Sequence, residues 1–444
     1  MMLRGFFGNK NRDKKTQQKT TNVPSEAKTT QARPPIKDKP KPKAKPWSTE
    51  QYKVAPEEGK TRFHDLGLDT SLLHGIADLN YQYCSDIQAE SLPYTLKGHD
   101  VIGKAATGTG KTAAFLLTII NDLANRPIPA SDRYSSEPRA LIIAPTRELA
   151  LQIEKDAVAL TKHMNTAVYS VLGGIDYQKQ KTHVRSEVID ILVATPGRLI
   201  DFLNSGDLYL DQLDFLVIDE ADRMLDMGFI PDVKRIISRC SKVEQRQTLL
   251  FSATFSEDVM NLAKRWTTNP VSVEIESEQM TTDTVEQKVF MVAADEKLKI
   301  ICNYIDSNEV TKAIIFGNRR DETRRLESAL KSKGIKAALL SGEVPQHKRI
   351  KTLDQFKSGQ IEILVATDVA GRGIHVDGVS HVFNYNLPEV AEDYVHRIGR
   401  TGRAGETGVS ISFACEDDAF LLPEIEKYIG MKLTCEYPDY LLDK

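Results

Sequence analysis

The segment from Ala105 to Thr112, AATGTGKT, has the composition of a loop that binds phosphate. It lies between an expected strand at 100–102 and an expected helix over 112–125. Small residues let backbone N–H groups converge on phosphate oxygens at a helix N-terminus. Lys111 can then reach the β- and γ-phosphates of a nucleotide, and the Thr112 hydroxyl can bind Mg²⁺. The predicted phosphate-binding residues are Ala105, Ala106, Thr107, Gly108, Thr109, Gly110, Lys111 and Thr112.

An acidic pair, Asp219 and Glu220, follows the apolar run 215–218. Asp219 can hold the Mg²⁺, and Glu220 can orient and deprotonate the water that attacks a γ-phosphate. Acidic residues are also common at helix starts because they interact favourably with the helix dipole. The phosphate loop and the acidic pair together favour a site of nucleotide hydrolysis.

Short runs that are apolar on both faces alternate with helical segments from about residue 61. Parallel strands buried between two layers of helices need such runs, so we expect an α/β protein with parallel sheets. The expected strands include 142–144, 191–193, 215–218, 249–251, 314–316, 363–365 and 381–383.

The chain also contains an internal repeat. Residues 140–143 and 190–195 recur in similar form as 313–316 and 362–367, at offsets of 173 and 172. Two matches in the same order indicate two similar domains in tandem. The polar stretch 267–286 is the expected join.

The first 46 residues are strongly basic. They hold thirteen Lys and Arg residues and three acidic residues, which gives this segment a net charge of +10. Because the whole chain of 444 residues has a net charge of −3, the remaining residues carry −13. Lysine- and proline-rich sequence of this kind buries too little apolar surface to fold, and we expect a disordered arm. The arm is either a solubilising leader or a segment that holds a polyanion.

The composition excludes several classes of protein. No run of about 18 apolar residues is present, and the first residues lack the apolar stretch of a secretion signal. The five cysteines contain no CxxC pair, which is typical of a reduced compartment. We therefore expect a cytoplasmic protein with no membrane partner.

With these features the chain resembles the DEAD-box RNA helicases, a family named for the sequence Asp-Glu-Ala-Asp, which stands here at 219–222. The resemblance covers roughly 62–433. Within the family the chain is most similar to the bacterial degradosome-associated RhlB type, through the segments 84–88, 371–375 and 411–416. Its other motifs follow in family order: PTRELA at 145–150, GG at 173–174, TPGR at 195–198, SAT at 252–254 and HRIGRTGR at 396–403.

The resemblance implies two tandem RecA-like domains, each a parallel sheet flanked by helices, that close around ATP and RNA. The expected boundaries are 1–55 for the basic arm, 56–272 for the first domain, 273–285 for the linker, 286–436 for the second domain and 437–444 for a short tail.

The resemblance also assigns roles to residues outside the loop. Gln88 would read the adenine edge and Phe63 would stack on the ring, while Arg400 and Arg403 would reach the γ-phosphate from the second domain. Ser252, Thr254 and His396 would couple the domains. The implied RNA contacts are Arg147, Gly174, Thr195, Arg198, Gln355 and Thr367.

Two positions depart from the family pattern. Ala106 stands where glutamine is usual, and we expect little effect because the phosphate cradle is mostly backbone. His375 replaces an aspartate that touches the ATP ribose, so we expect weaker ATP binding by the isolated protein.

The function implied is an ATP-dependent RNA helicase that uses Mg²⁺, hydrolyses ATP on RNA-promoted domain closure and unwinds structured RNA locally in bacterial mRNA turnover. Its expected partners are RNA and a nuclease scaffold of the degradosome. One alternative is an ATP-gated RNA clamp or scaffold subunit that unwinds weakly. The other is a DNA helicase or a different P-loop phosphotransferase.

Overall fold

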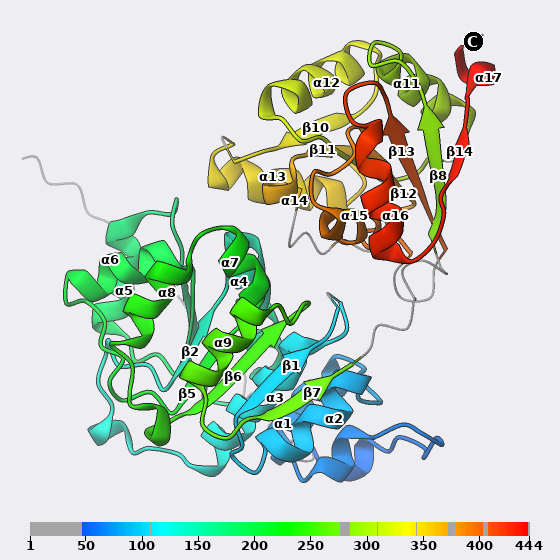
Figure 1. Cartoon of the computed structure of the whole chain (residues 1–444). Helices are drawn as coiled ribbons and strands as arrows, with labels where there is room; N and C mark the ends of the chain where they lie inside the picture. Colours follow the sequence, from blue (N-terminus) through cyan, green and yellow to red (C-terminus); the bar gives the residue numbers. More distant parts are fainter. Residues whose placement is uncertain are drawn as a thin grey trace, which may run out of the picture. The chain divides into compact units, whose positions relative to one another are not determined.

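The computed structural model describes residues 47–106, 108–275, 285–308, 310–342, 344–371, 376, 378–402 and 407–442. Two lobes follow one another along this part of the chain, and each is built on a seven-stranded parallel sheet (Figure 1). The predicted α/β architecture of two tandem domains is confirmed. Residues 1–46 of the predicted arm lie outside the described residues.

The first sheet has the strand order β3-β4-β2-β5-β6-β1-β7. Its strands are β1 (Val101–Lys104), β2 (Ala140–Ile143), β3 (Val168–Val171), β4 (Ile191–Ala194), β5 (Phe215–Ile218), β6 (Gln247–Ser252) and β7 (Val271–Glu274). Its helices are α1 (Thr70–Asp78), α2 (Asp86–Thr95), α3 (Lys111–Asn125), α4 (Arg147–Leu160), α5 (Tyr177–Ser186), α6 (Pro196–Asn204), α7 (Ala221–Asp226), α8 (Ile230–Ile237) and α9 (Glu257–Trp266).

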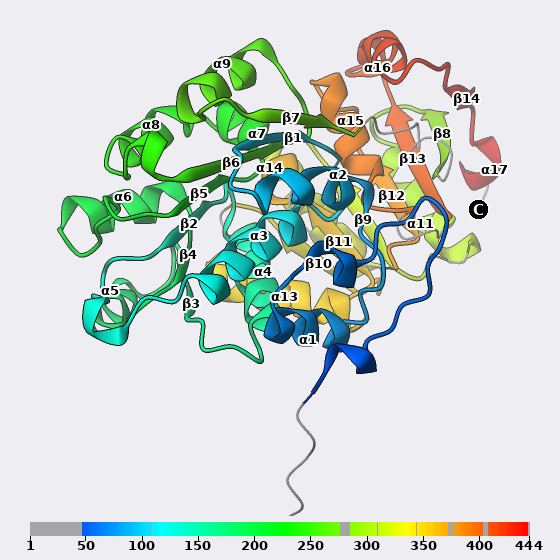
Figure 2. The ribbon, with the colours of Figure 1, turned by 90° about the horizontal axis from the view of Figure 1, so that it is seen from below.

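Helices cover both faces of this sheet, with α1, α3 and α4 on one side and α8 and α9 on the other (Figure 2). Along β2, Ala140 and Ile142 pack into one apolar core, whereas Leu141 and Ile143 pack into the other. This alternation explains why the strands are apolar at every position, since each face of the sheet is buried.

The second sheet has the order β10-β11-β9-β12-β13-β8-β14. Its strands are β8 (Val285–Met291), β9 (Ala313–Phe316), β10 (Ala337–Leu340), β11 (Ile363–Ala366), β12 (His381–Asn384), β13 (Gly408–Ala414) and β14 (Thr434–Glu436). Its helices are α11 (Lys297–Ser307), α12 (Arg320–Ser332), α13 (Gln346–Lys357), α14 (Asp368–Gly371), α15 (Ala391–Ile398), α16 (Leu422–Ile429) and α17 (Asp439–Leu442).

The two strand orders correspond position by position. The repeated segments form β2 and β4 in the first sheet and β9 and β11 in the second, and both pairs occupy the third and second places in their sheets. The internal repeat found in the sequence is therefore a repeat of topology.

The structure moves three of the predicted boundaries. Tyr52 is buried in the core of the first lobe and Trp47 stacks on His74, so the lobe begins before residue 56. The expected linker at 273–285 includes the end of β7 and the first residue of β8. The expected tail contains α17, whose Leu441 is fully buried in the second lobe. Among the described residues, no helix has the length and apolar character needed to cross a membrane.

Candidate active site

The phosphate loop connects β1 to α3, at the C-terminal edge of the first sheet. Gly108 and Gly110 have φ values of +91° and +94°, a conformation that favours glycine. A Cβ atom on Gly110 would lie 2.3 Å from Gln88 Nε2 and 2.8 Å from Ser85 Oγ, so a side chain there cannot fit without displacing its neighbours. The positive φ favours glycine at 110, and a larger residue would also displace the side-chain ends of Gln88 and Ser85. Thr107 lies outside the described residues.

Lys111 begins α3, one residue before the predicted start of the helix. Its side chain is buried, and Nζ donates a hydrogen bond of 2.5 Å to the carbonyl oxygen of Ala105. Thr109 Oγ1 donates to the carbonyl oxygen of Ala106 over 2.8 Å. The loop is thus closed on itself by two of its own side chains.

The acidic pair follows β5, as predicted. Asp219 is buried and its Oδ1 accepts the N–H of Glu220 over 3.0 Å. Burial raises the pKa of the Asp219 carboxyl, and the nearby Lys111 opposes the rise. Glu220 adopts φ 54° and ψ 54°, a left-handed conformation that is uncommon for a residue other than glycine.

A hydrogen-bond network ties the acidic segment to the residues after β6. Asp222 donates its N–H to Ser252 Oγ over 3.2 Å, and its Oδ2 accepts the N–H groups of Ala253 and Thr254 over 2.9 and 3.0 Å. The structure therefore places the predicted coupling residues Ser252 and Thr254 directly beside the acidic segment. Asp222 is the connecting residue, and sequence reasoning did not assign it a role.

One cavity of about 500 Å³ contains the loop, the acidic pair and the residues expected to bind adenine. Such a volume is in the range of ligand pockets. Its lining includes Phe63, Tyr81, Gln88, Gly108, Thr109, Gly110, Lys111, Thr112, Asp219 and Glu220. The structure thus brings together predicted site residues from four separate segments of the chain.

The carboxamide of Gln88 joins helix α2 to the phosphate loop. Its Oε1 accepts the N–H of Ser85 over 3.1 Å, which forms part of a capping box at the start of α2. Its Nε2 donates to the carbonyl oxygen of Gly110 over 2.9 Å. Gln88 therefore contacts the loop directly, and its role in reading adenine stays a prediction.

The aromatic residues of the cavity differ in exposure. Phe63 is 1% exposed, whereas Tyr81 is 41% exposed and its ring centroid lies 6.3 Å from that of Phe63. Tyr81 therefore offers the larger open surface to a base. Sequence reasoning missed it, although an aromatic residue seven positions before Gln88 was a usable signal.

Four of the residues predicted to contact RNA gather at the same edge of the first sheet. Arg147 starts α4 after β2, Gly174 follows β3, and Thr195 and Arg198 follow β4. A Cβ atom on Gly174 would lie 2.4 Å from Arg147 Nη1, so these two residues are in contact. Arg198 donates two hydrogen bonds, of 3.2 and 3.1 Å, to the carbonyl oxygen of Ile175.

In the second lobe, His396 and Arg400 line a small hollow together with Asp368 and Arg397. Arg397 is fully buried and binds both oxygens of Asp368, over 2.6 and 2.7 Å. Its Nη2 also donates to Asn318 Oδ1 over 2.7 Å. Arg397 therefore fixes the helix that carries His396, a function that sequence reasoning did not assign.

The remaining predicted residues of the second lobe are less closely grouped. Thr367 is buried directly after β11. Gln355 lies in the last turn of α13, and no described hydrogen bond of its side chain joins it to Thr367. Arg403 and His375 lie outside the described residues.

Comparison with known proteins agrees with this geometry. Residues 85–262 match the DEAD/DEAH box helicase family and residues 296–405 match the helicase conserved C-terminal domain. The ATP-dependent RNA helicase RhlB of Pseudomonas syringae pv. tomato is 59% identical over 385 residues, which cover 87% of this chain and 97% of the relative. The protein of the same name from Shewanella baltica is 47% identical over 369 residues, covering 83% and 84%.

Two solved structures are similar over most of the chain. S. cerevisiae Dbp5 bound to RNA and ADP BeF3 has a TM-score of 0.75 at 30% identity, covering 86% of this chain and 97% of that one. Mss116p bound to ssRNA and AMP-PNP also has a TM-score of 0.75, at 29% identity, covering 87% and 82%.

The first RecA-like lobe carries a phosphate loop and an acidic pair, and a second lobe of the same topology follows it. This combination defines the class of nucleotide-dependent helicases. The chain belongs to the DEAD/DEAH box helicase family.

Proposed function

We propose that the chain is an ATP-dependent RNA helicase that hydrolyses ATP to ADP and phosphate when RNA promotes closure of its two lobes. This proposal rests on one observation: Lys111, Asp219, Glu220 and Gln88 line the same cavity. The relatives named as RNA helicases and the structural neighbours with bound RNA support RNA as the substrate.

In this proposal Lys111 leaves the carbonyl oxygen of Ala105 and binds the β- and γ-phosphates. The loop N–H groups at the start of α3 bind phosphate oxygens in the same step. Glu220 orients the attacking water and accepts its proton. Arg400 and Arg403 of the second lobe stabilise the charge that develops on the transferred phosphoryl group, which makes hydrolysis depend on closure.

The residues of the site suit Mg²⁺. A hydroxyl oxygen on Thr112 and a carboxylate on Asp219 line the same cavity, and oxygen ligands are those that Mg²⁺ prefers. Among the described residues the Asp219 carboxylate accepts one hydrogen bond, from the N–H of Glu220, so oxygen lone pairs are left for a cation. When bound, Mg²⁺ would neutralise phosphate charge.

RNA would lie along Arg147, Gly174, Thr195 and Arg198 in the first lobe, with Thr367 and Gln355 in the second. Backbone groups, hydroxyls and arginines contact sugar and phosphate without reading bases, so we expect weak sequence preference. Contacts to the 2′-hydroxyl would distinguish RNA from DNA.

We further propose a role in bacterial mRNA turnover in the cytoplasm, with a nuclease scaffold of the degradosome as partner. The similarity to proteins named RhlB supports this assignment. The second candidate is an ATP-gated RNA clamp that unwinds weakly, because His375 departs from the family pattern at the expected ribose contact.

Steady-state ATPase measured without nucleic acid, with RNA and with DNA of equal length tests the proposal, beside a strand-separation assay. We expect stimulation by RNA only, together with unwinding. RNA stimulation without strand separation would favour the clamp, and equal stimulation by DNA would contradict the RNA assignment.

Two variants assign the chemistry. Lys111→Ala should lose nucleotide affinity, whereas Glu220→Gln should bind ATP and RNA but hydrolyse at least 10²-fold more slowly, as expected for loss of a general base. Glu244→Gln, at an exposed acid of the same lobe, is the matched control. Turnover of Glu220→Gln equal to that of the control would refute the role given to Glu220.

A further inference from the structure

Arg198 is held in place by three neighbouring groups. It lies in the first turn of α6, and 10% of its side chain is exposed. Nη1 and Nη2 both donate hydrogen bonds to the carbonyl oxygen of Ile175. The guanidinium carbon lies 5.4 Å from the ring centroid of Tyr177 and 6.0 Å from that of Phe202. The guanidinium therefore lies against the protein surface and does not extend freely into solvent.

The ring of Tyr177 is itself fixed. It stacks on Phe202 with centroids 5.0 Å apart and an interplanar angle of 17°. Its hydroxyl group donates to Asp207 Oδ2 over 3.3 Å. Asp207 is buried and also pairs with Lys181, whose ammonium group lies 5.9 Å from the centroid of the same ring. Because turning the ring would break these contacts, Tyr177 gives Arg198 a rigid aromatic surface.

Arg198 keeps hydrogen-bond donors for a further partner. A guanidinium has five N–H groups, and two of those on Arg198 bind the carbonyl oxygen of Ile175. Nε is buried and has no hydrogen-bond partner among the described residues, since Asp201 Oδ2 is 3.9 Å away. One N–H group on each Nη atom is left, and guanidinium N–H groups suit phosphate oxygens.

The same contacts join two segments that we propose to bind RNA. Ile175 follows Gly174 directly, and Tyr177 begins α5 two residues later, after β3. Arg198 lies three residues after Thr195, which follows β4. β3 and β4 are neighbouring parallel strands, so both segments leave the sheet at the same edge. Tyr177 therefore fixes the spacing between Arg198 and Gly174 that a sugar-phosphate backbone has to match.

We propose that Tyr177 is a positioning residue for RNA binding, whose ring holds the Arg198 guanidinium where its free Nη groups bind a phosphate. An aromatic ring attracts a guanidinium without occupying its N–H groups, whereas a carboxylate partner would occupy them. Arg198 therefore loses less side-chain entropy when it binds. The inference rests on the proposed RNA-binding function and adds Tyr177 to it.

Two substitutions at 177 separate the ring from its hydroxyl group. The affinity of the full-length protein for a fluorescein-labelled oligouridine is measured by anisotropy with AMP-PNP and Mg²⁺, over about 50–200 mM KCl. Tyr177→Leu should weaken binding about fivefold. It should also lower the slope of log affinity against log salt concentration by up to about 0.7, the value for one phosphate contact with a single strand. Tyr177→Phe keeps the ring and should bind within about twofold of the parent protein.

A double substitution tests whether Tyr177 acts through Arg198. Arg198→Gln should weaken RNA binding at least as much as Tyr177→Leu, and adding Tyr177→Leu to Arg198→Gln should cause no further loss. Arg198→Lys keeps the positive charge but lacks the planar fork, so its affinity should stay near that of Arg198→Gln. This variant leaves Tyr177 in place, so it tests the geometry even where Tyr177→Leu lowers the stability.

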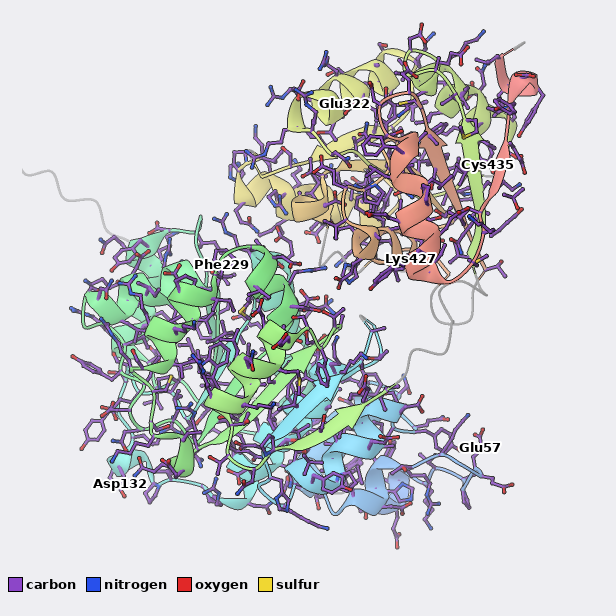
Figure 3. The ribbon with its side chains drawn as sticks, in the orientation of Figure 1. Glu57, Asp132, Phe229, Glu322, Lys427 and Cys435 are labelled. Atoms are coloured by element: carbon purple, nitrogen blue, oxygen red, sulfur yellow. The ribbon has the colours of Figure 1, made fainter. Side chains whose placement is uncertain are left out.

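Tyr134→Leu is the matched control. Tyr134 is 64% exposed in the same lobe. Its neighbour Arg133 pairs with Asp190, directly before β4, so Tyr134 lies toward the edge of the sheet opposite to Arg198. Asp132, two residues earlier, marks this part of the lobe in Figure 3. Tyr134→Leu should bind RNA like the parent protein, and thermal unfolding of each variant verifies that it is folded.

Parental affinity and salt slope in Tyr177→Leu would overturn the proposal, as would a further loss when Tyr177→Leu is added to Arg198→Gln. Parental affinity in Arg198→Lys would show that charge alone is enough, and would overturn it too. If the parent protein binds no RNA, the proposed function fails as well. RNA binding that is unaffected by Tyr177→Leu refutes only the role of Tyr177.

Discussion

Arg223 Nη1 donates a hydrogen bond of 2.8 Å to Glu220 Oε2, and both side chains are buried, with exposures of 4% and 6%. The pair spans the start of α7, where the left-handed backbone of Glu220 turns its carboxylate back toward the helix. A hydrogen bond to a charged group contributes about 1.5–3 kcal/mol. Arg223 therefore holds the proposed general base in one orientation.

Loss of this partner should slow hydrolysis without weakening ATP binding. We expect Arg223→Gln to lower kcat for RNA-stimulated ATPase about tenfold with little change in KM, since a misplaced base loses part of the roughly 10²–10⁴-fold that general-base catalysis provides. Arg223→Lys should recover part of the rate. Arg235→Gln, at an exposed arginine on α8, is the control. An unchanged kcat in Arg223→Gln would show that Glu220 needs no such support.

Gln88 supports both a helix cap and the phosphate loop, and two substitutions separate these functions. Gln88→Ala removes both hydrogen bonds and should lower the free energy of unfolding by about 1 kcal/mol while weakening ATP binding. Gln88→Glu keeps the acceptor for Ser85 N–H but loses the donor to Gly110, so it should weaken ATP binding with little loss of stability. Denaturant unfolding and nucleotide titration measure the two effects. If both variants lowered the free energy of unfolding equally, the helix-capping function of Gln88 would not be separable from its hydrogen bond to the phosphate loop.

The first lobe begins before the boundary predicted from composition, so two truncations should differ. Removal of 1–46 should leave the Tm unchanged but weaken RNA binding and reduce its salt dependence, because fewer phosphates are neutralised. Removal of 1–55 also deletes Tyr52, whose buried ring contributes about 1.5–3 kcal/mol and whose hydroxyl donates to the carbonyl oxygen of Tyr81 in the cavity wall. The longer deletion should therefore lower the Tm by several degrees. Equal Tm values would place the start of the folded lobe after residue 55.

His381 should make the stability of the second lobe depend on pH. Burial among Tyr304 and Phe383 lowers the pKa of His381 below its usual range. The unfolded chain, in which histidine titrates near about 6.5, then takes up a proton first. The stability contributed by this residue is fully present above about pH 6.5 and is lost as the pH falls through the lower folded pKa.

We expect His381→Phe to reduce the fall in denaturant midpoint between pH 7 and pH 5.5, because phenylalanine keeps the packing without the titration. His347→Gln, at an exposed position on α13, should leave the fall unchanged. The same pH dependence in His381→Phe and the parent chain would assign the effect to another group.

Local patterns were enough to predict the architecture and the centre of the site. The phosphate loop is recognisable within eight residues because backbone conformation at Gly108 and Gly110 restricts the side chains allowed there. The strands are recognisable because burial on both faces makes every position apolar. The repeat at offsets of 173 and 172 predicted two similar domains in tandem, and the two sheets have the same strand order.

The boundaries of the basic arm and of the short tail were predicted less accurately. Composition does not show whether a residue near the end of the chain packs against a core formed by residues distant in the sequence. Tyr52 looks like part of a polar leader in the sequence, yet its ring enters the core of the first lobe. Leu441 lies in an expected tail, yet α17 packs against α11 through it.

The amino-acid sequence by itself determined which segments form the glycine-containing loop and the strands and which segments repeat, since those properties depend on neighbours within a few residues. Only the tertiary structure decided that Gln88 bonds to Gly110, that Asp222 joins Ser252 and Thr254, that Arg397 binds Asp368, and that His74 and Asp78 meet His163. Asp222 meets Ser252 and Thr254 because β5 and β6 are neighbouring parallel strands, whereas the other contacts depend on how helices pack on the sheets. Such contacts depend on how whole elements pack, which no short stretch of residues encodes.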